Sequence, residues 1–123
     1  MDTKPLVWIG SSREDLKKFP EAVKDVAGFA LYKAQIGGKH PAAKPLKGFH
    51  GAGVVEIVES YSGNAYRVIY TTRLEGAIFV LHAFQKKAKT GIETPKQEIE
   101  LINSRLKTAS EYHELRFKKR GIP

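Results

Sequence analysis

Cysteine is absent from the 123 residues, which excludes disulfides and thiolate metal sites. Its absence fits a reducing compartment, and we expect a cytoplasmic protein. No apolar run approaches the roughly 20 residues that span a bilayer, so we expect no membrane interaction. Residues 1–10 hold too short an apolar run for a signal peptide and show no cleavage-like site, so we expect none there.

The sequence motifs of familiar enzymes are also missing. There is no Gly-x-Ser-x-Gly turn, no His-Glu-x-x-His motif and no phosphate-binding glycine loop. Glu56 and Glu59 are three residues apart on a predicted strand, so they face opposite sides and make a poor carboxylate pair. The histidines lack metal-ligand spacing; they are His40, His50, His82 and His113. We therefore predict no metal and no other cofactor.

Acidic residues are scarce in two long stretches. From Val26 to Val55 there is none, and from Ser60 to Ile92 Glu75 is the only one. The basic side chains of these stretches are Lys33, Lys39, Lys44, Lys47, Arg67, Arg73, Lys86, Lys87 and Lys89. With a net charge of +8, this segregation favours a positive surface that binds nucleic acid or another polyanion. The alternative is a basic solvated surface with no partner.

The N-terminal third predicts a strand and two helices. Residues 5–9 form a short apolar strand, and the serines that follow, with acids three residues after each, start a first helix. Pro20 breaks this helix or restarts it. From Glu21 apolar residues recur at intervals of three and four, which predicts an amphipathic helix that ends at Gly37-Gly38. Residues 37–53, with five glycines and two prolines, are predicted to form a loop.

Three strands and a last helix complete the pattern. The strands cover residues 54–60, 65–72 and 77–84, and their close spacing predicts an antiparallel meander. Thr94 is predicted to cap the last helix, with Pro95 at the first helical position and Gln97 reaching back.

The predicted order of elements is β-α-α-β-β-β-α, in one α+β domain over residues 1–123. We place its core at about residues 5–107. Residues 113–123 are predicted to form a basic, frayed C-terminal tail.

Arg67 lies inside an otherwise apolar strand. A cation is costly there unless it faces a cleft or a partner anion, or unless it pairs with Glu56 or Glu59 across the strands. Residue types alone do not decide between these interpretations.

The lysines after the last strand also allow two interpretations. Lys86, Lys87 and Lys89 are typical of a solvated strand edge. They could instead converge with Arg67 and Lys47 on one phosphate, where several cations would hold an RNA backbone and stabilise charge during cleavage.

The remaining chemical candidates are more typical of a core. His82, which alternation places on the side of Ile78 and Phe84, is better explained as a core histidine with satisfied hydrogen bonds than as a general base. Tyr66 and Tyr70 share one strand face and could stack on unpaired bases, but core packing is the favoured interpretation.

Several segments form a recognisable series of motifs. The most specific is the block from Ile78 to Thr90, with its His-x-Phe-x-Lys-Lys-x-x-Lys-Thr pattern. The others are Asp15-Leu16 with Phe19-Pro20, Gln35–Gly37, Pro45–Gly48 before Val55–Ile57, Arg67–Tyr70 and Thr94–Ile99. In these motifs and their order, over roughly residues 5–107, the chain resembles the phage-derived HigB-like toxins of the RelE/ParE superfamily.

This resemblance implies a mainly antiparallel sheet with helices on one face and an open basic face opposite. It also implies a ribosome-dependent mRNA endonuclease, in which the substrate 2′-hydroxyl attacks the adjacent phosphate without a metal. Arg67 would then stabilise that phosphate, and Lys86 or Lys87 would act as phosphate ligand or leaving-group acid. The predicted RNA-binding residues are Lys44, Lys47, His50, Arg73 and Lys89.

The partners that the resemblance implies are the ribosomal A site, its mRNA, and a helix-turn-helix antitoxin that covers or distorts the basic face. Operator DNA would be bound only through the antitoxin. Two other functions stay open from the sequence. One is a ParE-like toxin that inhibits DNA gyrase without cleaving RNA, and the other is a phage-derived protein that binds nucleic acid without catalysis.

Overall fold

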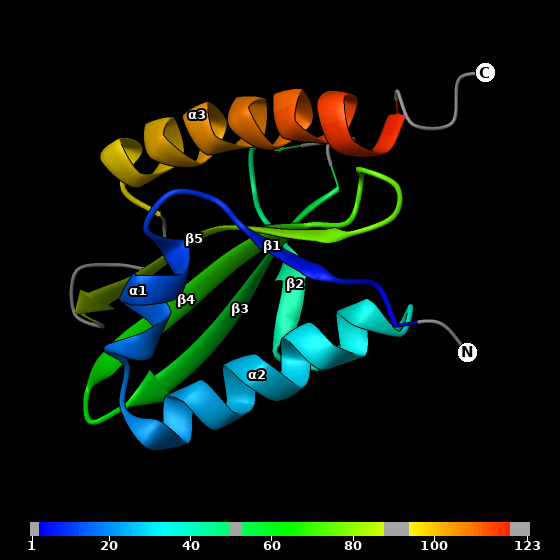
Figure 1. Cartoon of the computed structure of the whole chain (residues 1–123). Helices are drawn as coiled ribbons and strands as arrows, with labels where there is room; N and C mark the ends of the chain where they lie inside the picture. Colours follow the sequence, from blue (N-terminus) through cyan, green and yellow to red (C-terminus); the bar gives the residue numbers. More distant parts are fainter. Residues whose placement is uncertain (1–2, 50–52, 88–93, 119–123) are drawn as a thin grey trace.

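A computed structural model of the chain describes residues 3–49, 53–87 and 94–118 (Figure 1). Its elements are β1 (Leu6–Trp8), α1 (Ser12–Lys17), α2 (Glu21–Gln35), β2 (Ala43–Pro45), β3 (Val54–Tyr61), β4 (Asn64–Thr71), β5 (Ile78–Lys87), α3 (Lys96–His113) and the π-helical turn η2 (Glu114–Lys118). The predicted α+β class is confirmed. Within the described residues, no helix combines the length and apolar character needed to cross a bilayer.

The five strands form one sheet in the order β1-β5-β4-β3-β2. β3, β4 and β5 make the predicted antiparallel meander, and β1 pairs in parallel with β5, so the sheet is mixed. Strand β2 is an addition to the prediction, because it lies inside the expected loop 37–53 and pairs with Val55–Ile57 of β3. Pro45 has no N–H to donate, and it is tolerated in β2 because this strand lies at the edge of the sheet.

Helices cover both faces of the sheet, which corrects the expectation of helices on one face. The buried side of α2 packs on one face in a core cluster that includes Leu31, Val68 and Val80. Ile102 and Ala109 of α3 pack on the other face with Phe79 and other residues. Figure 1 shows the sheet between α3 and α2. The reason is that β4 and β5 are apolar at successive positions, so both of their faces must be buried.

The helix ends differ in detail from the prediction. Pro20 precedes α2 and confirms the predicted restart. At the last helix Pro95 is itself the cap residue, without a side-chain capping bond, and the helix begins at Lys96. The prediction of Thr94 as cap was therefore wrong by one residue, because Pro95 takes the extended ψ of 150° that a cap residue needs.

The region after Tyr112 is also different from the predicted frayed tail. The helix runs on into η2, and Phe117 packs at the edge of the core with its ring 6.2 Å from that of Phe79. His113 Nε2 lies 2.7 Å from the Glu75 carbonyl oxygen. Because Phe117 covers an apolar surface of the core, these contacts hold η2 in place. Residues 119–123 of the predicted tail lie outside the described residues.

The docking of α3 on the second face can be tested at Ile102, which is fully buried. We expect Ile102→Ala to lower the free energy of unfolding by about 2–5 kcal/mol, through lost burial and the cavity left behind. Leu115→Ala, at a site that is 65% exposed, should change it by less than about 0.5 kcal/mol. Urea denaturation of both variants measures the difference, and equal effects would contradict the docking.

Burial raises the pKa of the Tyr70 hydroxyl above its ordinary value of 10.0. The folded state therefore holds this proton more tightly than the unfolded state, and the stability it contributes is lost as pH rises above about 10. We expect Tyr70→Phe to lose less stability than the wild type between pH 9 and pH 11. Urea denaturation at several pH values measures this, and parallel pH profiles would contradict it.

Candidate functional site

Three of the predicted cations line one pocket of about 460 Å³. Lys44 and Lys47 come from β2 and the turn after it, and Arg67 comes from the middle of β4. The remaining lining residues are Pro45, Leu46, Gly48, Glu56, Thr94 and Ile99. The pocket therefore lies on the α3 side of the sheet, between the β2–β3 segment and the first turn of α3. Its charged side chains are three cations and one carboxylate.

A buried ion pair lies in this pocket. Arg67 Nη1 donates to Glu56 Oε2 at 2.7 Å, and both side chains are only 7% exposed. The other carboxylate oxygen of Glu56 is 3.8 Å from Lys44 Nζ. The pairing across the strands is thus to Glu56 and not to Glu59. Sequence reasoning considered Glu56 only as one of two possible partners of Arg67 and missed it as a site residue, because nothing in the sequence shows that this carboxylate lies between two cations.

The register of the sheet explains why these side chains meet. Arg67 is opposite Val58, so Glu56 is its diagonal neighbour on the same face. Lys44 is directly opposite Glu56 on the other side of β3. Alternation along three adjacent strands therefore brings the three charged groups together.

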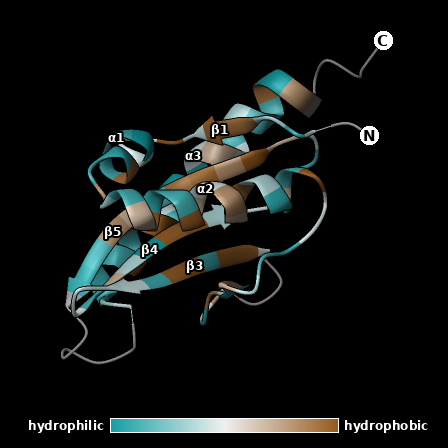
Figure 2. Cartoon of the chain, turned by 90° about the horizontal axis from the view of Figure 1, so that it is seen from below, coloured by the Kyte–Doolittle hydropathy of each residue, from teal (hydrophilic) through white to brown (hydrophobic). Residues whose placement is uncertain are grey.

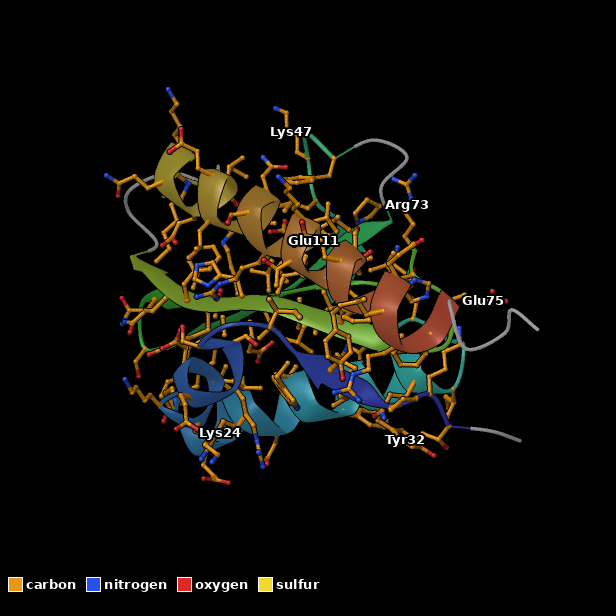
Figure 3. The ribbon with its side chains drawn as sticks, turned by 45° about the horizontal axis from the view of Figure 1, so that its top comes forward. Lys24, Tyr32, Lys47, Arg73, Glu75 and Glu111 are labelled. Carbon is orange, nitrogen blue, oxygen red and sulfur yellow. The ribbon has the colours of Figure 1, made fainter. Side chains whose placement is uncertain are left out.

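The turn that carries Lys47 is anchored by apolar side chains. Leu46 and Phe49 are buried in the core cluster beneath α3, and Leu46 N–H donates to the Val54 carbonyl. Gly48 has a φ of +93°, which favours glycine. Because both flanks are fixed, Lys47 is held at the rim of the pocket. It projects away from the sheet on the side of α3 (Figure 3).

The lysines of β5 have different positions. Lys86 is 8% exposed and paired with Ala65, so it is a diagonal neighbour of Arg67 on the same sheet face. It has no ion-pair partner among the described residues. Lys86 does not line the pocket, and it is buried rather than part of a solvated edge. Lys87 pairs with Asn64 through the backbone, and its side chain lies outside the described part.

Among the other predicted RNA-binding residues, Arg73 is not brought to this pocket. Arg73 lines a separate pocket of about 520 Å³, together with His113, Phe117 and their neighbours. His50 and Lys89 lie outside the described residues.

His82 has the satisfied hydrogen bonds of a core histidine, as predicted. Its Nε2 is 2.7 Å from Glu98 Oε1, its Nδ1 is 3.4 Å from Arg105 Nη1, and its ring stacks on Phe84 at 4.7 Å. The prediction of the sheet face on which His82 lies was wrong in part. The register shifts by one residue at Ile69/Tyr70, so His82 shares a face with Phe84 but not with Ile78.

The two strand tyrosines are core residues, as favoured from the sequence. Tyr66 and Tyr70 are buried beneath α2, and the Tyr66 ring meets the Phe19 ring edge-on at 4.9 Å. They lie on the face opposite the pocket and offer no platform for bases there. Among the described residues, no cluster of three or more histidines and carboxylates could hold a metal ion.

A protein-family model, Phage derived protein Gp49-like (DUF891), matches residues 14–107. The chain belongs to the phage-derived Gp49-like family. No curated protein matches this Gp49-like chain significantly.

The fold is also found among solved structures. A double arginine-to-alanine mutant of the Escherichia coli toxin RelE in the free state is 17% identical, with a TM-score of 0.55, and the match covers 86% of this chain and 97% of RelE. The RelBE2 toxin–antitoxin complex of Mycobacterium tuberculosis is 21% identical, with a TM-score of 0.42, covering 72% and 95%. The predicted placement of the Gp49-like chain in the RelE superfamily is confirmed.

The Glu56–Arg67 pair should contribute to stability as well as to the pocket. Glu56→Gln or Arg67→Met alone breaks the buried pair and keeps one of its two charges, so we expect each to lower the free energy of unfolding by about 3–5 kcal/mol. The double variant should be much less destabilised than the sum of the two.

Lys44→Met is the matched control, because the Lys44 side chain is 63% exposed and its contribution should be below about 1 kcal/mol. Urea denaturation of the four variants measures the coupling. Additive effects of Glu56→Gln and Arg67→Met would show that the pair is not formed in solution.

Proposed function

We propose that the chain is the toxin of a toxin–antitoxin module and cleaves mRNA on the ribosome without a metal. One observation carries this proposal: Lys44, Lys47 and Arg67 converge with the carboxylate of Glu56 on a single pocket. Three cations fit a phosphate and the charge that builds on it during cleavage. The RelE fold is consistent with this chemistry.

In the proposed reaction the 2′-hydroxyl of one nucleotide attacks the phosphorus of the adjacent phosphate. The new bond joins the 2′-oxygen to phosphorus, and the bond from phosphorus to the 5′-oxygen of the next nucleotide breaks. Glu56 accepts the proton of the 2′-hydroxyl, since it is the only carboxylate that lines the described pocket. The products are a 2′,3′-cyclic phosphate and a 5′-hydroxyl.

The cations have separate roles in this proposal. Lys44 and Lys47 bind the phosphate oxygens from the rim, and Arg67 both orients Glu56 and stabilises the phosphorane. Lys86 lies outside the pocket but diagonal to Arg67 on the same sheet face, and it is proposed to donate a proton to the leaving 5′-oxygen where the RNA leaves the pocket toward β5. Arg73, which lines a different pocket, is proposed to bind RNA where the mRNA continues. Lys87, His50 and Lys89 are proposed as further RNA-binding residues.

In this proposal the ribosome positions the mRNA so that the scissile phosphate lies in the pocket of about 460 Å³. We further propose that a helix-turn-helix antitoxin binds the chain and keeps it inactive. Operator DNA would then be contacted by the antitoxin alone.

The test is inducible expression followed by primer extension on a translated reporter mRNA. Wild type should arrest growth and produce cuts within codons, and purified protein with ribosomes should produce 2′,3′-cyclic phosphate ends. Lys44→Met/Lys47→Met should lower the cleavage rate about 100-fold with an unchanged melting temperature, because it removes two exposed phosphate ligands.

Lys17→Met is the control, since Lys17 lies on α1 in a surface pair with Glu14 and faces no pocket lined by the candidate residues. It should cleave like wild type. Growth arrest with intact mRNA and trapped gyrase would overturn the nuclease and support a ParE-like toxin. RNA binding with normal growth would support a non-catalytic protein.

A further inference from the structure

Helix α2 has a second face that the fold does not use. Its buried side consists of Val23, Ala27, Ala30, Leu31 and Ala34. A separate stripe, exposed or half-buried, lies on the far side of the helix and is made of Ala22, Asp25, Val26, Phe29, Tyr32, Lys33 and Ile36. At about 100° per residue these seven positions fall within an arc of roughly 120°. We call this set the outer stripe.

The outer stripe is unusually apolar for a solvent-facing surface. Phe29 is 55% and Tyr32 48% exposed, and they lie one turn apart on the helix. Single exposed apolar residues are normal, but here two aromatic rings are flanked by Ala22, Val26 and Ile36. Figure 2, seen from this side, shows α2 in front of the sheet, and in Figure 3 Tyr32 projects away from the sheet. Such a contiguous patch is typical of an interaction site.

The order of residues along the stripe indicates what binds there. When a second copy of the stripe is laid antiparallel to the first with Phe29 at the centre, each residue faces one of complementary chemistry. Asp25 falls opposite Lys33, and the apolar pairs are Ala22 with Ile36, Val26 with Tyr32, and Phe29 with its own copy. Neither Asp25 nor Lys33 has an ion-pair partner among the described residues. An antiparallel pair of identical helices would therefore place acid against base and apolar against apolar at every position.

We propose that two copies of the chain associate through a two-fold, antiparallel packing of their α2 helices, centred on Phe29. Two-fold interfaces require a self-complementary surface, which the outer stripe provides. A partner with a different sequence would not require the charges of the outer stripe to be arranged symmetrically about Phe29. RNA is disfavoured because the stripe is a convex helix surface that carries Asp25, whereas single strands bind along positive grooves.

The association should be weak. One pair of helices buries less than the roughly 800 Å² per partner of a standard stable interface, and each copy carries a net charge of +8. We therefore expect a monomer–dimer equilibrium in the micromolar range. Since α2 and the candidate pocket lie on opposite faces of the sheet, the dimer leaves both pockets open and directed apart.

Sedimentation equilibrium of the purified chain tests the interface. Phe29→Ser/Tyr32→Ser should raise the dimer dissociation constant at least about 10-fold, because it removes the apolar centre. Tyr61→Ser/Leu115→Ser is the matched control, since those side chains are 44% and 65% exposed at other places. The control pair should associate like wild type, and circular dichroism should show that both variants are folded.

Charge reversal separates a specific interface from general repulsion. Asp25→Lys and Lys33→Asp should each weaken the dimer, and the double reversal should restore it. Lys33→Asp lowers the net charge from +8 to +6, so repulsion between whole molecules alone would strengthen association instead. Weakening by this variant is therefore diagnostic of the Asp25–Lys33 contact.

A disulfide gives a second measurement, because the chain has no cysteine of its own. Phe29→Cys should form a disulfide-linked dimer under mild oxidation, and Ser104→Cys, on the exposed side of α3, should not. The proposal is overturned if the chain stays monomeric at millimolar concentration, if the double reversal fails to restore association, or if the stripe binds RNA or another protein and not its own copy.

Discussion

The ion pair between Glu56 and Arg67 is the contact on which the candidate site depends. It joins β3 to β4 in a place where both side chains are almost fully buried. A buried cation is tolerated only with a partner anion, so the carboxylate allows a positive group to lie inside the sheet surface. The same carboxylate holds Lys44 on its outer side. One acidic residue therefore organises a pocket whose other charges would repel one another.

The position of α3 decides where that pocket can be. The helix covers Phe79, Leu81 and their neighbours on one face, and its first turn forms one wall of the pocket. The network of His82, Glu98 and Arg105 holds the helix to β5, because Arg105 also donates to the Leu81 carbonyl. A histidine that could have been a catalytic base is thus part of the helix attachment. In the proposed reaction, catalysis is therefore assigned to the carboxylate and the cations on the neighbouring strands.

Much of the fold could be predicted, because local patterns determine it. Apolar spacing and the prolines located the helices, and turn clusters separated the three meander strands. What the sequence did not predict depends on contacts between distant segments. The three-residue strand β2 has no pattern of its own and exists because β3 has a free edge. The second helix-covered face follows from burial on both sides of β4 and β5, and the shift at Ile69/Tyr70 is invisible to simple alternation.

The candidate site was predictable only in part, because it too depends on contacts between distant segments. Lys44, Lys47 and Arg67 stood out because they lie in two stretches poor in acids, and the structure brings them together. Glu56 was expected only as a possible partner of Arg67, since its place in the site comes from register: it is opposite Lys44 and diagonal to Arg67. Arg73 is as basic as the others but comes after the end of β4 and lines a different pocket.

The parallel pairing of β1 with β5 has a consequence for the synthesis of the chain. Leu6–Trp8 is made first, but its partner Ile78–Val80 is made some seventy residues later. Contacts of such long sequence separation form slowly, and during translation they cannot form until the distant segment has left the ribosome. The meander must therefore be complete before the first strand can join the sheet. A truncated product that stops before β5 would lack both the strand that joins β1 to the meander and the surface on which α3 packs, so it could not assemble the candidate pocket.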